Sequence, residues 1–499
     1  MQDNRIKSFV IVGGGTAGWV SAAILSRVLS GTDCKITLVE SPDIPTIGVG
    51  EATIPSIIDM LDFLAISVND FVKQTNATFK LGIKFIDWLR EGHHYWHQFG
   101  NIGSRIDGKP FYQHWLKTQF FGSQHELTDF SAAVAMAKRD RFFIPDPKNP
   151  NIMSSSTFAL HFDAGLVAEY LADYSRVKGV KSVSANVIDV QLDTGGRINS
   201  LALDNGQQLS GDFFIDCSGQ KGLLIEQALE VGYDNWQNYL PVNSAVVMQT
   251  ENYGQLAPYT EATAHEHGWR WRIPLQNRTG NGYVFCDEHC NNDTATDLLS
   301  KHVQGQAITE PRVLKFVTGK RKKMWHKNCL AVGLSSGFLE PLESTSIYLI
   351  MRAMLNFVQS IPDKDLWQVT IDEYNRLMDH EYECIRDFIV LHYCETERTD
   401  SDFWQEWQTR EIPDSLKTKI DLFRSQGRLF RDDMDLFAPD SWYAVLEGMG
   451  VRPKSYDPTV DVSDFSKIQQ LLQKHSMALA DSAEHVPGHE SFIKLLLKY

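Results

Sequence analysis

The chain of 499 residues is longer than a single hydrophobic core usually grows, so one large or two closely joined domains with room for a cofactor are expected. Its 48 basic and 63 acidic residues give a formal net charge of −15 without basic runs, which argues against a nucleic-acid partner. Seven scattered cysteines do not suggest a disulfide framework, so a cytoplasmic location is expected. No apolar run approaches the roughly 18 residues of a membrane span.

The N-terminal residues predict a strand, a glycine-rich loop, a helix and a second strand. Phe9 to Val12 form an apolar run, and apolar residues recur at helical spacing until Ser30-Gly31 ends the helix. Lys35 to Val39 then predict a parallel strand that leads to Glu40. A secretion signal is an alternative for the first residues, but three consecutive glycines interrupt the apolar helix that such a signal needs.

The glycines between the first strand and the helix form a G-x-G-x-x-G pattern. The loop residues are Gly13, Gly15, Thr16, Ala17 and Gly18. Such a loop presents backbone N–H groups and the positive end of a helix to a pyrophosphate. Glu40 follows Gly18 by 22 residues, where a carboxylate can accept hydrogen bonds from a ribose 2′-OH. A dinucleotide site is therefore predicted.

The middle of the chain gives weaker signals. Residues 57–90 are predicted to be helical, which places Lys80 on a helix. From Gly92 to Pro150 aromatic residues are dense and irregularly spaced, which favours a loop-rich wall of a pocket; an apolar patch under loops is an equally good alternative. An antiparallel meander is predicted for three short strands separated by turn residues, namely Val183–Val190, Ile198–Leu203 and Gln208–Ile215.

After Pro362, apolar residues at three- and four-residue intervals predict a long amphipathic helix and a mostly helical C-terminal part. The predicted fold class is α/β, with a Rossmann-like body that carries the glycine loop and the meander. We expect this body to cover residues 1–360, with a substrate-wall insertion at about 90–150, and a helical substrate-side region to cover 361–499. The final apolar segment, Phe492–Leu497, is expected to be a docked helix.

One cluster suggests a metal ligand set without completing it. Cys286-Asp287-Glu288-His289-Cys290 contains suitable side chains, but a second ligand pair at a familiar spacing is missing from the sequence. A strand end followed by a polar loop is the better interpretation. No metal site is predicted.

Further motifs are distributed along the chain, and the most specific is Trp269-Arg270-Trp271-Arg272-Ile273-Pro274. The others are Gly13 to Trp19, Gly48 to Thr53, Phe79-Lys80 with Ile83, His97 to Phe99, Asp216 to Gly219 and Gly333 to Ser346. Through these motifs the sequence resembles the flavin-dependent tryptophan halogenase family over essentially its full length. An FAD-binding body is therefore expected.

The resemblance implies that reduced FAD, O2 and chloride or bromide give hypohalous acid, which travels through an internal tunnel to an organic substrate. The implied cofactor residues are Gly13, Gly15, Thr16, Ala17, Gly18, Glu40, Gly50, Glu51, Ala52, Gly333 and Leu334. The sequence has no second glycine loop for NAD(P)H, so we expect a separate NAD(P)H-dependent flavin reductase to supply the reduced flavin. The oligomeric state stays open, with a homodimer among the alternatives.

By the same resemblance Lys80 is the lysine at the tunnel end and Glu343 the carboxylate beside it. An amine is a good halogen acceptor, and a carboxylate can stabilise the positive ring intermediate and remove its proton. Without the resemblance, Lys80 would be interpreted as an exposed helix lysine and Glu343 as a solvated loop acid or helix cap.

Thr345 and Ser346 match the positions whose backbone N–H groups hold the halide. Ser346 departs from the family, which usually has glycine there, and we expect bromide to be used at least as readily as chloride. The remaining tunnel and substrate-pocket residues implied by the resemblance are His97, Phe99, Trp269, Trp271, Pro274 and Ser344. Two tryptophans two residues apart are also simply one face of a buried strand.

The C-terminal part departs from tryptophan halogenases. Those enzymes carry a tyrosine-rich lid with a glutamate and a Phe-Trp pair that hold the amino acid, before a segment like Ser441 to Gly450. Residues 431–437 of this chain lack that set. The expected substrate is therefore indole or an indole derivative rather than free tryptophan. A flavin-dependent monooxygenase of an aromatic substrate and a non-catalytic flavin-binding protein are the alternatives.

Overall fold

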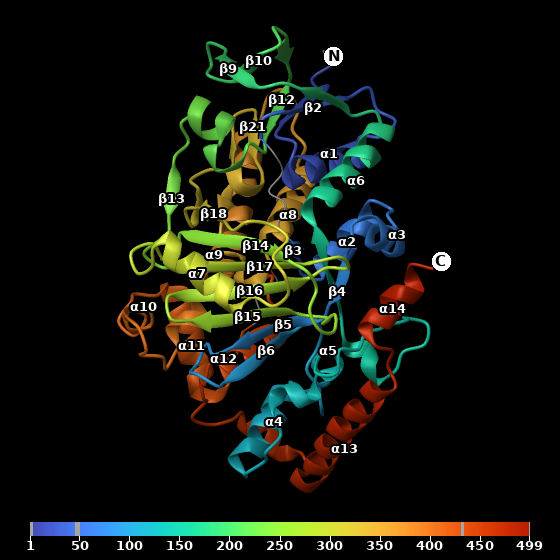
Figure 1. Ribbon diagram of the computed structural model, residues 1–499, viewed down its shortest axis with the longest axis vertical. Helices are drawn as coiled ribbons and strands as arrows, with labels where there is room; N and C mark the ends of the chain where they lie inside the picture. Colours follow the sequence, from blue (N-terminus) through green and yellow to red (C-terminus); the bar gives the residue numbers. More distant parts are fainter. Residues whose placement is uncertain (1–2, 45–49, 431–433, 499) are drawn as a thin grey trace. The chain divides into compact units, whose positions relative to one another are not determined.

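The computed structural model describes residues 3–44, 50–430 and 434–498, and the chain forms two compact units whose segments alternate along the sequence (Figure 1). Unit 1 comprises Met1–Asn76, Phe162–Pro241 and Phe316–Glu383. Unit 2 comprises Ala77–His161, Val242–Lys315 and Cys384–Tyr499. This division differs from the predicted boundary near residue 360, because strands from distant segments pair within each unit.

A six-stranded sheet forms the centre of unit 1. Its strands are, in order, β20 (Trp325–His326), β21 (Cys329–Ala331), β12 (Phe213–Asp216), β1 (Ser8–Val12), β2 (Lys35–Glu40) and β8 (Lys181–Ser184). All neighbours are parallel except β20 and β21. Residues Phe9 to Val12 are buried, since β1 lies inside the sheet. The predicted strand, loop, helix and second strand are confirmed.

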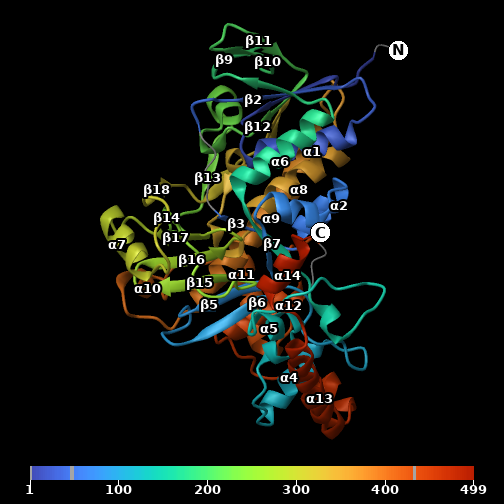
Figure 2. The same ribbon diagram turned by 45° about the vertical axis from the view of Figure 1, so that its right-hand side comes forward.

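Unit 1 also contains helices. They are α1 (Thr16–Val28), α2 (Ser56–Phe63), α3 (Val68–Gln74), α6 (Ala164–Val177) and α8 (Ser346–Gln359). Of these, α1 packs against β1 and β2 of this sheet and against both α6 and α8 (Figure 2). The predicted long helix after Pro362 is α9 (Gln368–Cys394), which includes the boundary between the segments of the two units.

The predicted meander of unit 1 is confirmed with shifted ends. It consists of β9 (Val187–Leu192), β10 (Ile198–Leu203) and β11 (Gln208–Ser210), paired antiparallel. Val183 belongs instead to β8 of the parallel sheet, and the third predicted strand divides at Gly211-Asp212, after which β12 returns to that sheet. A small sheet contains β13 (Tyr233–Asn235), β19 (Gly319–Arg321) and β22 (Gly337–Phe338).

Unit 2 is built on a seven-stranded sheet, whose strands lie side by side in Figure 1. Its strands are, in order, β18 (Arg312–Lys315), β14 (Ser244–Thr250), β17 (Thr279–Phe285), β16 (Gly268–Pro274), β15 (Thr260–His265), β5 (Gly82–Ile86) and β6 (His94–Gln98). Neighbours are antiparallel except β15 and β5. Separately, β4 (Thr78–Lys80) pairs antiparallel with β7 (Ala159–Asp163).

The prediction that Lys80 lies on a helix is wrong. The helical part of residues 57–90 ends with α3, and Lys80 is the last residue of strand β4. The four-residue interval between Lys80 and Lys84 suggested a helix. The apolar residues around them nevertheless alternate, as Phe79, Leu81, Ile83 and Phe85, and this two-residue period is that of a strand.

The helices of unit 2 carry most of the C-terminal sequence. They are α4 (Phe111–Phe120), α5 (Ala132–Ala137), α7 (Asn292–His302), α10 (Asp402–Glu406), α11 (Asp414–Gln426), α12 (Pro439–Gly448), α13 (Phe465–Glu484) and α14 (His489–Leu496). The aromatic region from 92 to 150 is more regular than predicted, because β6, α4 and α5 bury many of its rings. In the described part of the chain no helix has the length and hydropathy needed to cross a membrane.

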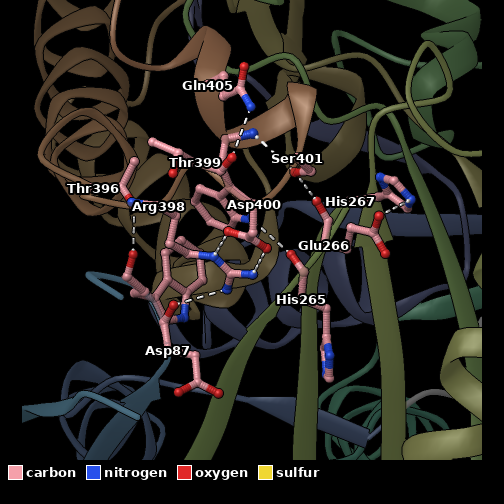
Figure 3. Close-up of polar contacts among 12 residues, drawn as sticks. Asp87, His265, Glu266, His267, Thr396, Arg398, Thr399, Asp400, Ser401 and Gln405 are labelled. Carbon is pink, nitrogen blue, oxygen red and sulfur yellow. Dashed lines mark hydrogen bonds and ion pairs between the residues drawn. The ribbon is translucent and has the colours of Figure 1, made fainter. Parts of the chain in front are cut away.

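A polar cluster fixes the chain to the sheet of unit 2 directly after α9 (Figure 3). The guanidinium of Arg398 donates to both carboxylate oxygens of Asp400, at 2.9 and 2.6 Å, and to the carbonyl oxygen of Asp87 at 3.0 Å. The Ser401 hydroxyl donates to the carbonyl oxygen of Glu266 in the turn between β15 and β16, at 2.5 Å. The C-terminal helices therefore start from a fixed point on this sheet.

The segment from Cys286 to Cys290 follows the end of β17 and forms a turn, in which the N–H groups of His289 and Cys290 both donate to the Cys286 carbonyl oxygen at 3.1 Å. This agrees with the predicted strand end and polar loop. All seven cysteines are free thiols.

Candidate active site

The glycine loop of unit 1 leaves the start of α1 open. Gly15 precedes the helix, and no side chain caps the first-turn N–H groups. A side chain at Gly18 would overlap the Gly13 carbonyl oxygen, so glycine is required there for packing. At Gly15, in contrast, an added Cβ would meet no protein atom within 4 Å. Free N–H groups and open space at a helix N-terminus suit a pyrophosphate, so this loop fits FAD.

Glu40 ends β2 beside the loop. Its side chain occupies the space into which a Cβ at Gly14 would project, and its carboxylate lies 3.8 Å from the Arg176 guanidinium. The carboxylate is partly exposed and thus available as an acceptor for a ribose hydroxyl.

A second predicted cofactor segment reaches the same loop. Gly333 opens the turn Gly333–Ser335 with a φ of +71°, and a Cβ there would lie 2.7 Å from the Cβ of Ala17. Only glycine allows this approach. The turn is also tied to β12, since Val332 N–H donates to the Asp216 carbonyl oxygen at 2.9 Å. Leu334 is therefore brought next to the first turn of α1, as expected of residues that contact one cofactor.

Gly50, Glu51 and Ala52 form the short strand β3 (Gly50–Ala52); residues 48 and 49 of the predicted motif lie outside the described residues. Burial raises the pKa of the Glu51 carboxyl to about 7. This group can therefore be present as acid or carboxylate near neutral pH.

The predicted halide residues surround the start of α8, also in unit 1. The turn Pro341–Glu343 ends at Ser344, whose φ of +59° is unusual for a residue other than glycine, and Thr345 then precedes the helix without a side-chain cap. Glu343 is fully buried, Thr345 is 2% exposed, and Ser346 is half-buried. The N–H groups of this first turn form a second place in unit 1 suited to an anion.

Lys80 in unit 2 is 0% exposed, which contradicts its interpretation as a surface lysine. Its ammonium nitrogen lies 5.2 Å from the centre of the Phe99 ring, within the range of a cation–π contact. Among charged side chains lysine is one of the least often fully buried. Complete burial against an aromatic ring is therefore a functional signal.

His97 and Phe99 belong to an aromatic cluster in unit 2. The His97 ring is inclined to those of Phe99, Phe388 and Phe437, with centroid distances of 6.0, 5.3 and 5.8 Å. Trp442 on α12 packs edge-on against Phe388 at 4.8 Å. We call His97, Phe99, Phe388, Phe437 and Trp442 the aromatic cluster.

Trp269 and Trp271 lie on β16 and are both buried, with ring centroids 5.9 Å apart. Their strand is joined to the strand of Lys80, because the hydroxyl of Thr78 donates to the carbonyl oxygen of Pro274 at 2.7 Å. The Trp-x-Trp-x-Ile-Pro motif thus ends at a hydrogen bond two residues from the lysine.

The sequence matches the tryptophan halogenase family over residues 8–464. The chain belongs to the tryptophan halogenase family. The structure is similar to that of BrvH, a flavin-dependent halogenase from Brevundimonas sp. BAL3, with 41% identity, a TM-score of 0.95 and coverage of 99% of this chain and 100% of that one.

Two other proteins are similar over nearly the whole chain. Xcc4156, a flavin-dependent halogenase from Xanthomonas campestris, shares 40% identity with a TM-score of 0.95, covering 99% of this chain and 98% of that one. Tryptophan 6-halogenase SttH from Streptomyces toxytricini is 35% identical over 92% of this chain and 94% of its own. The protein is therefore a flavin-dependent halogenase, and the predicted fold class is confirmed.

In this halogenase the predicted residues separate by unit. All residues implied for FAD and halide, together with Glu343 and Ser344, belong to unit 1. The residues of unit 2 are Lys80, His97, Phe99, Trp269, Trp271 and Pro274.

Two buried histidines of unit 2 were not predicted. His161 and His489 are 0% and 1% exposed, and each makes two hydrogen bonds. His161 interrupts the apolar run Ala159 to Phe162, and a lone polar residue in such a strand is a weak signal for a buried role. His489 has no comparable local signal.

Proposed function

We propose that this halogenase oxidises bromide, chloride or both to hypohalous acid with FAD held by unit 1, and transfers the halogen by way of Lys80 to an electron-rich aromatic. The proposed substrate is indole or an indole derivative rather than free tryptophan. The observation that carries this proposal is the complete burial of Lys80 against Phe99, within family-matched motifs.

Unit 1 would hold the cofactor and the halide. The first turn of α1, which starts after Gly15, would bind the pyrophosphate, and Glu40 would bind the ribose. The turn at Gly333-Leu334 would contact the flavin end of the cofactor. Reduced FAD supplies, with O2, the oxidising equivalents that convert halide to hypohalous acid. The N–H groups at Thr345 and Ser346 would hold the halide. A separate NAD(P)H-dependent reductase would deliver the reduced flavin.

Lys80 of unit 2 and Glu343 of unit 1 would carry out halogen transfer. The overall change is HOX + ArH → ArX + H2O, in which the ring carbon exchanges its proton for the halogen and hydroxide leaves as water. The Lys80 amine would donate a hydrogen bond to hypohalous acid or accept its halogen, protected from bulk water by burial. The carboxylate of Glu343 would stabilise the positive ring intermediate and remove the proton.

The aromatic cluster supports an indole-type substrate, since inclined rings offer both faces and edges for stacking. Nearby charges are already engaged. Lys419 lies 3.1 Å from Asp435 and over the Trp442 ring at 3.9 Å, and Asp440 accepts the Ile102 N–H at 3.0 Å. Groups engaged in this way are less able to hold the ammonium and carboxylate of an amino acid.

The names of the similar proteins do not decide between indole and tryptophan, so the choice rests on the residues of this chain. BrvH and Xcc4156, which share more residues with this chain than SttH does, are named flavin-dependent halogenases without a substrate, whereas SttH is named a tryptophan 6-halogenase. The sequence departure at residues 431–437 falls partly on positions 431–433, which lie outside the described residues.

The experiment is a substrate panel. The protein is incubated with FAD, a flavin reductase, NADH, O2 and bromide or chloride, against indole, substituted indoles and tryptophan, and products are identified by mass. We expect halogenated indoles, with bromide used at least as readily as chloride. Tryptophan as the preferred substrate would reject the substrate assignment. Oxygenated product formed without halide would reject halogenation in favour of a monooxygenase.

A further inference from the structure

The strand that carries Lys80 is held at every residue around the lysine. This strand, β4, has only three residues, and β7 pairs with one of its edges. On the other edge, Phe79 N–H donates to Nε2 of His489 at 3.1 Å and Leu81 N–H to the Pro258 carbonyl oxygen at 2.7 Å. A histidine ring thus supplies an acceptor that a neighbouring strand would normally provide.

His161 holds the same strand through a side chain. It lies opposite Thr78 in the pairing of β4 with β7, with Nδ1 3.1 Å from the Thr78 hydroxyl and Nε2 2.8 Å from the Thr260 hydroxyl. The single Thr78 proton is donated to the Pro274 carbonyl oxygen. His161 Nδ1 must therefore carry a proton, and in the neutral ring Nε2 accepts from the Thr260 hydroxyl.

The same reasoning assigns the proton of His489. Its Nε2 accepts from Phe79 N–H, so Nδ1 must donate to the Leu256 carbonyl oxygen, which lies 2.7 Å away. His489 is the first residue of α14, and its own N–H donates to the Asp140 carbonyl oxygen at 2.8 Å. The C-terminal helix therefore reaches the residue before Lys80.

The His489 ring must be neutral to make its bonds, because a protonated imidazole has no acceptor nitrogen, and the His161 ring is neutral when its Nε2 accepts from Thr260. Burial lowers the pKa of His489 to about 4. Burial, and then the positive charge of Lys80, holds the pKa of His161 well below its usual range. The geometry and the electrostatics of the buried site agree.

We propose that His161 and His489, both in the neutral Nδ1–H form, are positioning residues that hold Lys80 for halogen transfer. This inference rests on the proposed function of Lys80. If either histidine is lost, Lys80 should still be present but displaced, and a displacement of about 1 Å can cost up to roughly 10²-fold in a reaction that depends on orientation. Hypohalous acid should then escape before it reacts with the substrate.

The test measures coupling, defined as halogenated product formed per hypohalous acid produced, with escaped acid captured by a soluble scavenger. We expect His161→Leu and His489→Phe to lower coupling by about tenfold while FAD affinity and halide oxidation stay unchanged. His161→Asn keeps a donor near the Nδ1 position and His489→Gln keeps an acceptor for Phe79, so both should restore coupling to within about threefold of the wild type.

The matched control is His114→Leu. His114 is also a buried histidine of unit 2, but it lies on a different element, α4. Its Nε2 lies 3.2 Å from the Ile106 carbonyl oxygen. It should leave coupling unchanged. A proportional loss of halide oxidation and product in the His161 and His489 variants would overturn the proposal, because a general folding defect lowers both. Should His161→Leu not fold, Thr260→Val, which removes only the far hydrogen bond, must lower coupling for the proposal to stand.

A second measurement is independent of activity. Nitrogen-15 NMR of histidine-labelled protein should show two neutral rings protonated at Nδ1 and unchanged between pH 6 and 8, which disappear in His161→Asn and His489→Gln respectively. A ring protonated at Nε2, or at both nitrogens at pH 7, would overturn the assignment. Lys80→Ala separates the two hypotheses. Halogenation retained in that variant rejects the proposed function, whereas halogenation lost there but coupling retained in the histidine variants rejects only the positioning.

Discussion

The two units build their parts of the site from different chemistry. Unit 1 contributes backbone N–H groups at the uncapped N-termini of α1 and α8. Glycine at position 333 lets this part of the backbone approach Ala17. Unit 2 presents buried side chains, namely Lys80 against Phe99, with two histidines holding its strand. A backbone site needs a local run of small residues, whereas a side-chain site needs partners from distant parts of the chain.

The largest effect is expected at the side-chain site. Lys80→Ala should lower halogenation by more than about 10²-fold, because no other group in the proposed mechanism passes the halogen to the substrate. FAD binding and halide oxidation belong to unit 1 and should persist. Product mass, FAD titration and captured hypohalous acid are measured together.

The matched control is Lys84→Ala. Lys84 lies on β5 in the same unit, with its ammonium 5.8 Å from the Trp96 ring, so it tests the loss of a lysine–aromatic contact without loss of the proposed acceptor. Its product yield should stay near wild type. Loss of FAD binding in Lys80→Ala would mean that the division of labour between the units is wrong.

The backbone site can be tested with one added methyl group. Gly15→Ala adds a Cβ that meets no protein atom within 4 Å, so stability should not change. The methyl group would occupy space assigned to FAD and should weaken FAD binding by roughly a hundredfold, about 2.7 kcal/mol. Gly18→Ala is the contrasting variant, since its Cβ overlaps the Gly13 carbonyl oxygen and should destabilise the loop itself. Unchanged FAD affinity in Gly15→Ala would remove the pyrophosphate from this position.

The same contrast decides what sequence alone could predict. The glycine loop, Glu40 and the meander are local patterns, and the structure contains all three. Lys80 lies on a strand and not on the predicted helix, because its spacing of four from Lys84 suggests a helix whereas Phe79, Leu81 and Ile83 alternate as in a strand. The sequence does not indicate the proposed positioning residues, because their partners are distant in the chain. His161 bonds to Thr78 across 83 positions, and His489 bonds to Phe79 across 410 positions.

Acid should act on unit 2 through His489. Its pKa is about 4 in the folded chain and about 6.5 when unfolded, so between these values the unfolded state binds the extra proton. The free energy of unfolding should therefore fall as pH drops from 6.5 to 4, by about 1.4 kcal/mol per pH unit from this group. Denaturant titrations at several pH values measure this, and His489→Gln, which cannot titrate, should show a shallower slope. Equal slopes would show that the ring is not buried and neutral.

Glu51 should act in the opposite direction in unit 1. Its pKa is raised from 4.5 to about 7, so the folded state holds the extra proton in this window and stability falls as pH rises from 4.5 to 7. Because the residue is only partly buried, we expect about 1–2 kcal/mol in total. Glu51→Gln mimics the protonated form and should remove this contribution. A variant that keeps the wild-type pH dependence would contradict the raised pKa.

The smallest effect concerns which halide unit 1 accepts. Ser346 is half-buried at the first position of α8. Its side chain lies beside the N–H groups that would hold an anion, so its size affects the space for the halide. With bromide and chloride in competition, we expect the wild type to give mainly brominated indole, partly because bromide is easier to oxidise. Ser346→Gly should change the ratio of brominated to chlorinated product by about threefold, which corresponds to a change in relative binding of less than 1 kcal/mol. Ser360→Gly at the other end of the helix, where glycine is tolerated, should leave the ratio unchanged. Mainly chlorinated product from the wild type would contradict this prediction. It would mean that neither the easier oxidation of bromide nor Ser346 determines which halide is used.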